Sequence, residues 1–210
     1  MYEFVTLRPY YHLLTTLSIH LICNISPDDD KKTMKILGMC GSLRSDSYNS
    51  KLLKFTLRRL SSRVKYCTHF IANLNLPLFN EDIENSKGIP SEVYKLAQSI
   101  KGSHAIFIST PEYNKNLSGV LKNALDWTSR VKPQPWKGKP IIILSAASGQ
   151  SGGERAQYSL RQCLIPFDPV LFFAPEITVP DASNAFDEDN VPKSKIIIEK
   201  IDRQLSNLQP

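Results

Sequence analysis

The sequence lacks the residue patterns that usually build metal centres or redox-active disulfides. Its 210 residues include four cysteines and four histidines, and none of them is spaced as a C-x-x-C pair or a zinc-binding cluster. Cys40 and Cys67 lie in apolar runs, where we expect both to be buried as small hydrophobic side chains. This use of cysteine suits a reducing cytosol, and we predict no metal ligands.

Long apolar runs and concentrated basic charge are also missing. The moderately apolar stretch from Tyr10 to Ile25 contains His12, His20 and several threonines, so it is too short and too polar to span a membrane. It also lacks a small-x-small cleavage site. The net charge of +6 arises from dispersed lysines and arginines, whereas a nucleic-acid surface would favour basic blocks with interleaved aromatics. We therefore predict a cytoplasmic protein with an anionic small-molecule ligand and no membrane or nucleic-acid partner.

Residues 1–33 differ from the remainder, because the alternating patterns typical of a folded domain begin only at Met34. We expect residues 1–33 to be a disordered extension, or the product of an upstream start codon used in place of Met34. Residues 34–210 are long enough to bury a full hydrophobic core. The sequence therefore predicts one folded domain over residues 34–210.

From Met34 onward, strand-like and helix-like runs alternate. Strands are predicted near 35–40, 64–70, 104–109, 140–146 and 176–179, and helices near 49–62, 90–101, 118–130, 153–164 and 193–207. The third and fourth strands are continuous apolar runs rich in β-branched residues, which is typical of central strands covered on both faces. This order predicts an α/β fold, a doubly wound five-stranded parallel sheet with helices on both faces. Ligands of such sheets bind beyond the carboxyl ends of the strands.

The segment Gly41-Ser42-Leu43-Arg44-Ser45-Asp46-Ser47-Tyr48-Asn49 follows the first strand and precedes the first helix. The free N–H groups and the dipole of a helix N-terminus favour an anion at such a turn. Ser42, Ser47 and Asn49 add neutral donors, and Arg44 adds a charge suited to phosphate oxygens. The segment therefore indicates a phosphate-ester site; an ordinary serine-rich turn with a helix cap is the alternative. It is not a Walker loop, because the Gly-Lys-Ser/Thr ending is missing.

Two further loops follow the third and fourth strands, so they should meet the first loop at one edge of the sheet. In Ser109–Asn114, Pro111 restricts the backbone, which leaves peptide groups and Tyr113 to face a planar heterocycle. In Ser145–Gly153, small residues allow a ligand close to the backbone. Taken singly, an exposed tyrosine loop and a flexible turn are the alternatives. In the helix that follows Asn114, Asp126, Trp127 and Arg130 indicate either a subunit contact or an ion pair.

Together these segments resemble the NADPH-dependent FMN reductase family of flavodoxin-like proteins, which includes quinone, chromate and azo-dye reductases. The resemblance is carried by Gly41-Ser42-Leu43-Arg44 with Ser47 and Asn49, by Pro111-Glu112-Tyr113-Asn114, by Gly119-Val120-Leu121-Lys122-Asn123-Ala124-Leu125-Asp126-Trp127, and by Gly149 with Gly152-Gly153. It implies that Ser42, Arg44, Ser47, Asn49 and Ser50 hold the FMN phosphate. It also implies that Pro111, Glu112, Tyr113 and Asn114 line the isoalloxazine, largely through backbone atoms, and that Ser145 to Gly149, with Ser148, close its other side. The length of the third loop leaves the roles of Gln150 and Ser151 open.

The resemblance further implies an NAD(P)H-dependent reductase that passes electrons through bound FMN to a quinone, a flavin or a similar small acceptor. The flavin would carry the chemistry, so no catalytic side chain is expected. The family is typically dimeric or tetrameric, with the helix that starts near Ser118 at the interface. A flavin-binding electron carrier or regulatory protein with little turnover is the alternative, which the basic charge and Arg44 disfavour. A phosphate-ester hydrolase is disfavoured because paired carboxylates and metal-ligand spacing are missing.

Overall fold

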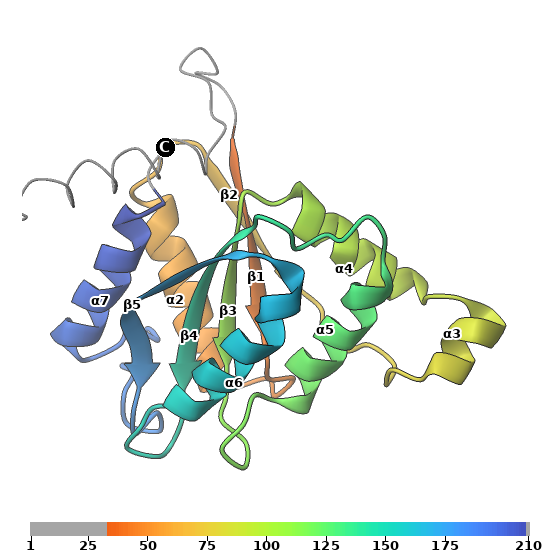
Figure 1. Cartoon of the computed structure of the whole chain (residues 1–210). Helices are drawn as coiled ribbons and strands as arrows, with labels where there is room; N and C mark the ends of the chain where they lie inside the picture. Colours follow the sequence, from red (N-terminus) through yellow and green to blue (C-terminus); the bar gives the residue numbers. More distant parts are fainter. Residues whose placement is uncertain (1–32, 209–210) are drawn as a thin grey trace, which may run out of the picture.

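The computed structural model describes residues 33–208 as one five-stranded sheet flanked by helices (Figure 1). The strands are β1 (Met34–Cys40), β2 (Cys67–Ala72), β3 (Ala105–Thr110), β4 (Pro140–Ala146) and β5 (Val170–Val179). They lie in the order β2-β1-β3-β4-β5, and every neighbouring pair is parallel. The predicted doubly wound parallel sheet is therefore confirmed. The prediction that residues 1–33 form an extension falls almost wholly outside the described residues.

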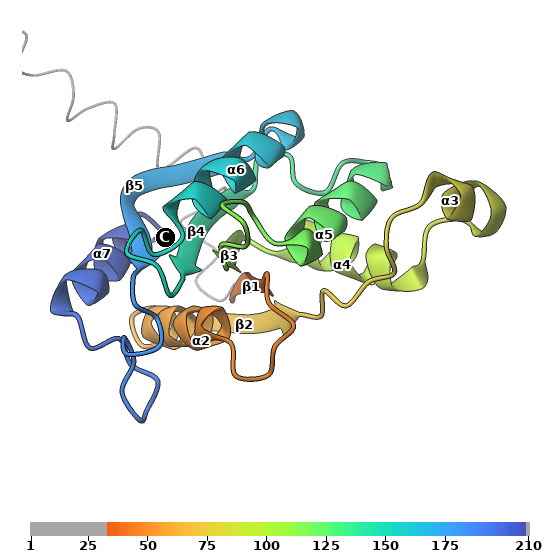
Figure 2. The ribbon, with the colours of Figure 1, turned by 90° about the horizontal axis from the view of Figure 1, so that it is seen from below.

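Helices cover both faces of the sheet, as expected. They are α2 (Tyr48–Ser61), α3 (Glu81–Lys87), α4 (Ser91–Gly102), α5 (Gly119–Arg130), α6 (Glu154–Leu164) and α7 (Lys195–Ser206), with a 3-10 turn at Ile165–Phe167. Figure 2 shows α2 and α7 on one face and α4, α5 and α6 on the other. Each face buries its own apolar cluster, with Leu53 and Ile201 in one and Leu96, Leu121 and Leu160 in the other. Within residues 33–208, no helix combines the length and apolarity needed to cross a bilayer.

Some element boundaries differ from those predicted. Helix α3 was not expected; none of its residues is buried, so it leaves no apolar period in the sequence. Strand β2 runs over 67–72 rather than 64–70, because this edge strand is mostly exposed and does not alternate. Strand β5 begins at Val170 rather than near 176, and its pairing with β4 shifts register between Ile142 and Leu144. Pro175 lies within β5 close to this shift, where it donates no ladder hydrogen bond.

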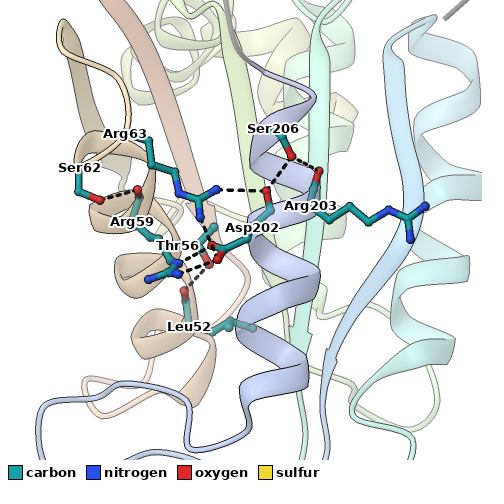
Figure 3. Close-up of polar contacts among 8 residues, drawn as sticks. All are labelled: Leu52, Thr56, Arg59, Ser62, Arg63, Asp202, Arg203 and Ser206. Carbon is teal, nitrogen blue, oxygen red and sulfur yellow. Dashed lines mark hydrogen bonds and ion pairs between the residues drawn. The ribbon is translucent and has the colours of Figure 1, made fainter.

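Helices α2 and α7 are joined by a carboxylate between two arginines (Figure 3). The Arg59 guanidinium donates from both Nε and Nη2 to the Asp202 carboxylate, with Nη2 2.6 Å from Oδ2. Arg63 Nη2 lies 2.8 Å from the same Oδ2, and Arg63 Nη1 donates to the Asp202 carbonyl oxygen at 3.3 Å. The hydrogen bond from Arg59, together with the charges of Arg59 and Arg63, lowers the pKa of Asp202, although partial burial acts in the opposite direction. The pair fixes the C-terminal helix on α2.

Asp126, Trp127 and Arg130, for which the sequence allows a subunit contact or an ion pair, all make contacts within this chain. Trp127 is fully buried and its Nε1 donates to the Pro77 carbonyl oxygen at 2.7 Å. Asp126 pairs with Lys122 at 2.6 Å, and Arg130 Nε lies 2.8 Å from Glu84 Oε2. Both charges thus have partners within the chain, as the ion-pair interpretation expects, although they do not pair with each other.

The two cysteines expected in the core differ in burial. Cys40 is buried at the end of β1, whereas Cys67 is only partly buried at the start of the edge strand β2. The prediction holds for Cys40 and is wrong for Cys67, because an edge strand lacks a neighbour on one side. Burial raises the pKa of the Cys40 thiol, although a hydrogen bond to Ser42 acts in the opposite direction. Cys40 is therefore a neutral thiol behind the first loop rather than an activated nucleophile.

Candidate functional site

A cavity of about 410 Å³ lies where the loops after β1, β3 and β4 meet, at the carboxyl edge of the sheet that Figure 2 views. Three inner strands end side by side at this edge, so their loops converge without a long connection. The cavity is lined by Ser42, Arg44, Ser47, Tyr48, Asn49, Pro111, Glu112, Tyr113, Ala146, Ala147, Ser148, Gly149 and Ser151. The convergence predicted from the sequence is present in the fold.

The first loop and the start of α2 form the basic end of the cavity. Ser47 is the N-cap of α2, and its side chain accepts a hydrogen bond from the Ser50 N–H at 3.4 Å. The Arg44 guanidinium carbon lies 5.0 Å from the centre of the Tyr48 ring, a distance suited to a cation–π contact. A Cβ on Gly41 would come within 2.8 Å of the Ser118 hydroxyl, so only glycine lets this loop pack against α5. The arrangement gives the cavity hydroxyls, a helix N-terminus and one cation.

Asn49 connects the first loop to two strands. Its Oδ1 accepts hydrogen bonds from the Ala146 N–H at 2.9 Å and from the Ser109 hydroxyl at 3.0 Å. Its Nδ2 donates to the Ala146 carbonyl oxygen at 2.8 Å. The side chain is 3% exposed, and one amide hydrogen is left for a ligand because a carboxamide carries two. Asn49 thus positions the wall of the cavity as well as lining it.

Glu112 performs a similar task in the second loop. Its carboxylate accepts from the backbone N–H groups of Arg155 and Ala156, at 3.1 and 3.4 Å. These groups belong to the first turn of α6, whose N-cap residue Gly153 has no side chain to satisfy them. Glu112 therefore caps α6 from another loop and ties together two sides of the cavity.

Tyr113 and the tight turn after it form the outer rim of the cavity. Tyr113 and Asn116 exchange backbone hydrogen bonds of 3.1 and 3.0 Å. Asn114 and Lys115 between them have positive φ values of 50° and 64°. The Tyr113 side chain is 53% exposed. This short hairpin places an accessible aromatic ring at the mouth of the cavity.

Most of the predicted binding residues line the cavity; the exceptions are Ser50, Asn114 and Ser145. Ser50 faces a neighbouring hollow. Asn114 lies in the tight turn outside the lining. Ser145 is fully buried, where its hydroxyl donates to the Gly152 carbonyl oxygen at 2.7 Å and accepts from Gln157 Nε2 at 2.8 Å. Any ligand contact by these three residues stays a prediction.

Two lining residues had no assigned role at the level of sequence. Tyr48 lies at the first position of α2 and within the predicted anion segment Gly41–Asn49, and this position is the signal that the sequence offers for it. Ser151, left open by the sequence, lines the cavity. Among residues 33–208, no group of three or more His, Cys, Asp or Glu side chains is placed to hold a metal ion. The cavity therefore offers binding groups, with hydroxyls and backbone amides as its main donors.

Comparison with known proteins gives consistent matches. The family model described as NADPH-dependent FMN reductase matches residues 34–183. An NAD(P)H-dependent FMN reductase of Pseudomonas aeruginosa is 40% identical over 176 residues, covering 84% of this chain and 94% of that protein. A quinone reductase of Escherichia coli is 36% identical over 143 residues, covering 68% of this chain and 76% of that protein. Among solved structures, the flavoenzyme NAD(P)H:(acceptor) oxidoreductase FerB of Paracoccus denitrificans has a TM-score of 0.71 at 30% identity, covering 83% of this chain and 96% of that one.

Proposed function

Because this chain belongs to the NADPH-dependent FMN reductase family, we propose that the three-loop cavity binds FMN and that the acceptor is a quinone, another flavin or a similar small molecule. The protein is an NAD(P)H-dependent flavin reductase. The observation that carries the cavity assignment is the convergence of a hydroxyl- and arginine-bearing helix N-terminus with a proline-restricted loop and a small-residue loop.

The donor set of the cavity fits the phosphate of FMN. Ser42 and Ser47 present hydroxyls beside the N-terminus of α2, and Arg44 supplies the charge. A phosphate there would receive charge-assisted hydrogen bonds from Arg44 and neutral bonds from the hydroxyls. Lys51 is paired with Asp46 at 2.7 Å, so Arg44 is the cation of the cavity lining that we assign to the phosphate.

The other end of the cavity fits the ring system. Pro111 restricts the second loop, and Glu112 is fixed on α6. We therefore expect the peptide groups between Pro111 and Tyr113 to face the ring system. Ala147, Ser148 and Gly149 leave room for a planar ligand on the opposite side. When bound, FMN supplies the hydride and electron transfer. The chain itself binds, orients and partly covers the ligand, a role that needs no acid–base pair.

We also propose that the protein is a cytoplasmic homodimer or homotetramer with α5 contributing to the interface. Large exposed apolar side chains support a further buried contact. They include Tyr113, Tyr158, Ile165 and Phe173, which are 53%, 51%, 72% and 59% exposed. The scattered free thiols support a reducing compartment.

The proposal is tested by the colour and turnover of the purified protein. We expect a yellow protein that releases FMN on heating, bleaches under anaerobic NADPH or NADH, and is reoxidised over many cycles by a quinone. A colourless protein that takes up no added FMN would refute the cavity assignment. Bleaching without turnover would favour the electron-carrier alternative.

The role of Arg44 provides a second test at the same site. Arg44→Ala removes one charge-assisted phosphate contact, which should weaken FMN binding by about 1.5 to 3 kcal/mol. Arg44→Lys keeps the charge and loses the planar guanidinium, so the FMN affinity of this variant should lie between those of wild type and Arg44→Ala. Fluorescence titration at low salt measures all three. Equal affinities would remove Arg44 from the phosphate site.

A further inference from the structure

Two more hollows continue from the phosphate end of the cavity along α2. The first, of about 170 Å³, shares Ser47 with the cavity and is lined by Ser45, Asp46, Ser47, Ser50, Lys51, Lys54, Arg58 and Asn190. The second, of about 450 Å³, shares Arg58 with the first and is lined by Phe55, Arg58, Arg59, Ser62, Asp189 and Val191. Since neighbouring hollows share residues, they follow one another along one helix. We call the two together the α2 groove.

The α2 groove has an excess of positive charge. Lys51, Lys54 and Arg58 line its first hollow, and their spacing of three and four residues places them on one stripe of α2. Lys51 is paired with Asp46. Within residues 33–208, neither Lys54 nor Arg58 makes a side-chain hydrogen bond or ion pair, in contrast to Arg59 (Figure 3). Two cations of the groove are therefore free to bind an anion.

The opposite wall of the α2 groove is a folded hairpin between β5 and α7, which lies beside α2 in Figure 2. Phe186 and Pro192 form a β-bridge, and the Asp187 carboxylate accepts from the Val191 N–H at 2.8 Å. The Phe186 ring stacks parallel to Tyr48, with centres 6.4 Å apart. This hairpin follows the segment that the family model matches, which ends at residue 183. The hairpin and α2 thus border the α2 groove on two sides.

The cavity and the two hollows of the α2 groove follow one another in the same order as the parts of a flavin dinucleotide. The first phosphate would lie at Ser47, an adjacent second phosphate at Lys54 and Arg58, and a nucleoside beyond them against Phe55 and Val191. Eleven residues separate Ser47 from Arg58, which is about 16 Å along a helix axis. At the far end the Asp189 carboxylate could accept a hydrogen bond from an adenine amino group. We propose that the α2 groove binds the adenosine phosphate half of FAD, so that the flavin site takes FAD as well as FMN.

NADPH also carries an adenosine phosphate, so the chemistry of the groove is common to both dinucleotides. FAD is favoured because its second phosphate is bonded to the flavin-side phosphate that the proposed function places in the cavity. The pyrophosphate of NADPH belongs to a separate molecule and would have to lie against that phosphate without a bond to it. The inference rests on the proposed function, since it assumes that a flavin phosphate occupies the cavity. A test must therefore follow FMN, FAD and the nicotinamide coenzymes separately.

The experiment is a flavin exchange on the purified protein. The protein is equilibrated with equal excesses of FMN and FAD and freed of unbound flavin, and the heat-released flavins are quantified by chromatography. We expect wild type to retain both, and Lys54→Ala/Arg58→Ala to lower the FAD:FMN ratio at least about tenfold, because two charge-assisted contacts to one phosphate are lost. The control Lys95→Ala/Lys101→Ala removes equal charge from α4, on the other face of the sheet, and should leave the ratio unchanged.

Each other outcome has a distinct meaning. Retention of FMN alone by wild type, or an unchanged ratio in the Lys54/Arg58 variant, overturns the inference and leaves the proposed function intact. A higher KM for NADPH but not NADH, with the flavin ratio unchanged, assigns the groove to the nicotinamide coenzyme and also overturns it. Failure of wild type to retain either flavin contradicts the proposed function itself. Unchanged FMN content in the double variant shows that it has folded.

Discussion

At the scale of single residues, the side chains of the site either face the ligand or hold its walls. Arg44 and Tyr113 reach into or over the cavity, whereas Asn49 and Glu112 are engaged by backbone groups of neighbouring loops. Arg44 and Asn49 belong to the segment after β1 and the start of α2, and Glu112 and Tyr113 belong to the loop after β3. Their chemical type alone does not separate the two roles; the separation depends on which backbone groups lie within hydrogen-bonding distance.

Asn49→Ala should destabilise the protein more than it weakens any single ligand contact. The change leaves the buried N–H and C=O of Ala146 and the hydroxyl of Ser109 without a shared partner. Each buried group left unsatisfied costs about 1 to 3 kcal/mol, so the free energy of unfolding should fall by at least about 2 kcal/mol. Urea unfolding of flavin-free protein measures this. Ser50→Ala, on the same turn of α2, serves as the control and should stay within about 0.5 kcal/mol of wild type.

Tyr113 is predicted to bind rather than to transfer a proton. Tyr113→Phe keeps the exposed ring at the mouth of the cavity and removes only the hydroxyl, so anaerobic flavin reduction by NADPH should slow by less than about tenfold, or 1.4 kcal/mol. Tyr113→Ala removes the ring and should impair flavin or acceptor binding more. Stopped-flow bleaching compares the variants. A hundredfold loss in the Phe variant with FMN still bound would instead give the hydroxyl a catalytic role.

At the scale of secondary-structure elements, the Asp202 cluster joins the C-terminal helix α7 to α2. These helices cover the same face of the sheet. Arg59 of α2 and Arg63, just after the end of α2, converge on one carboxylate (Figure 3). The packing of Ile197 and Ile201 against the α2 side of the core completes the contact. The cluster therefore contributes to holding one layer of the fold in place.

Stability should depend on pH through Asp202. Its pKa is lowered in the folded protein, so the ionised carboxylate is favoured by folding. Its contribution is fully present above the unfolded pKa, about 3.9, and is lost as pH falls through the lowered folded pKa. Asp202→Asn should cost about 1 to 2 kcal/mol near neutral pH, since the pair is partly exposed. Urea unfolding between pH 3 and 7 should show this difference shrinking below about pH 4; a constant difference would contradict the ionic explanation.

The elements that the sequence predicted well are those buried on one or both faces. β3 and β4 are fully buried, and their apolar runs identified them. α3 and the first half of β5 were missed because exposed or irregular segments leave no apolar period. At the site, Ser145 and Ser148 are three residues apart in one segment, yet only Ser148 reaches the cavity. The residue at which β4 ends determines which of the two serines faces the cavity. The local sequence pattern predicts the ends of secondary-structure elements poorly.

At the scale of the whole molecule, two apolar clusters on opposite faces of one sheet account for the main body of the fold. The alternation of strands and helices predicted the sheet class. The convergence of the three loops could be predicted from this sheet class, because the carboxyl ends of parallel strands lie at one edge of the sheet. The α2 groove could not be predicted in this way, since its walls are a helix near the start of the domain and a hairpin near its end.

A protein beginning at Met34 should fold and keep its flavin. Met34 is the first residue of β1, and its N–H donates to the Tyr66 carbonyl oxygen at 2.8 Å. The pairing of β1 with β2 and β3 is provided by residues 34–40. Thermal unfolding and FMN content should therefore match those of the full chain. Aggregation or loss of FMN in the shortened protein would assign residues 1–33 to the fold.

The order of the strands also determines where the molecule can fray. β1, β3 and β4 each have a neighbour on both sides, whereas β2 and β5 are the outer strands. Local opening begins where backbone hydrogen bonds are exposed and packing is sparse, which describes β2, with Phe70 43% exposed. The three loops of the cavity follow only the inner strands. The outer strands can therefore open locally while the inner strands, and the loops around the ligand that follow them, keep their positions.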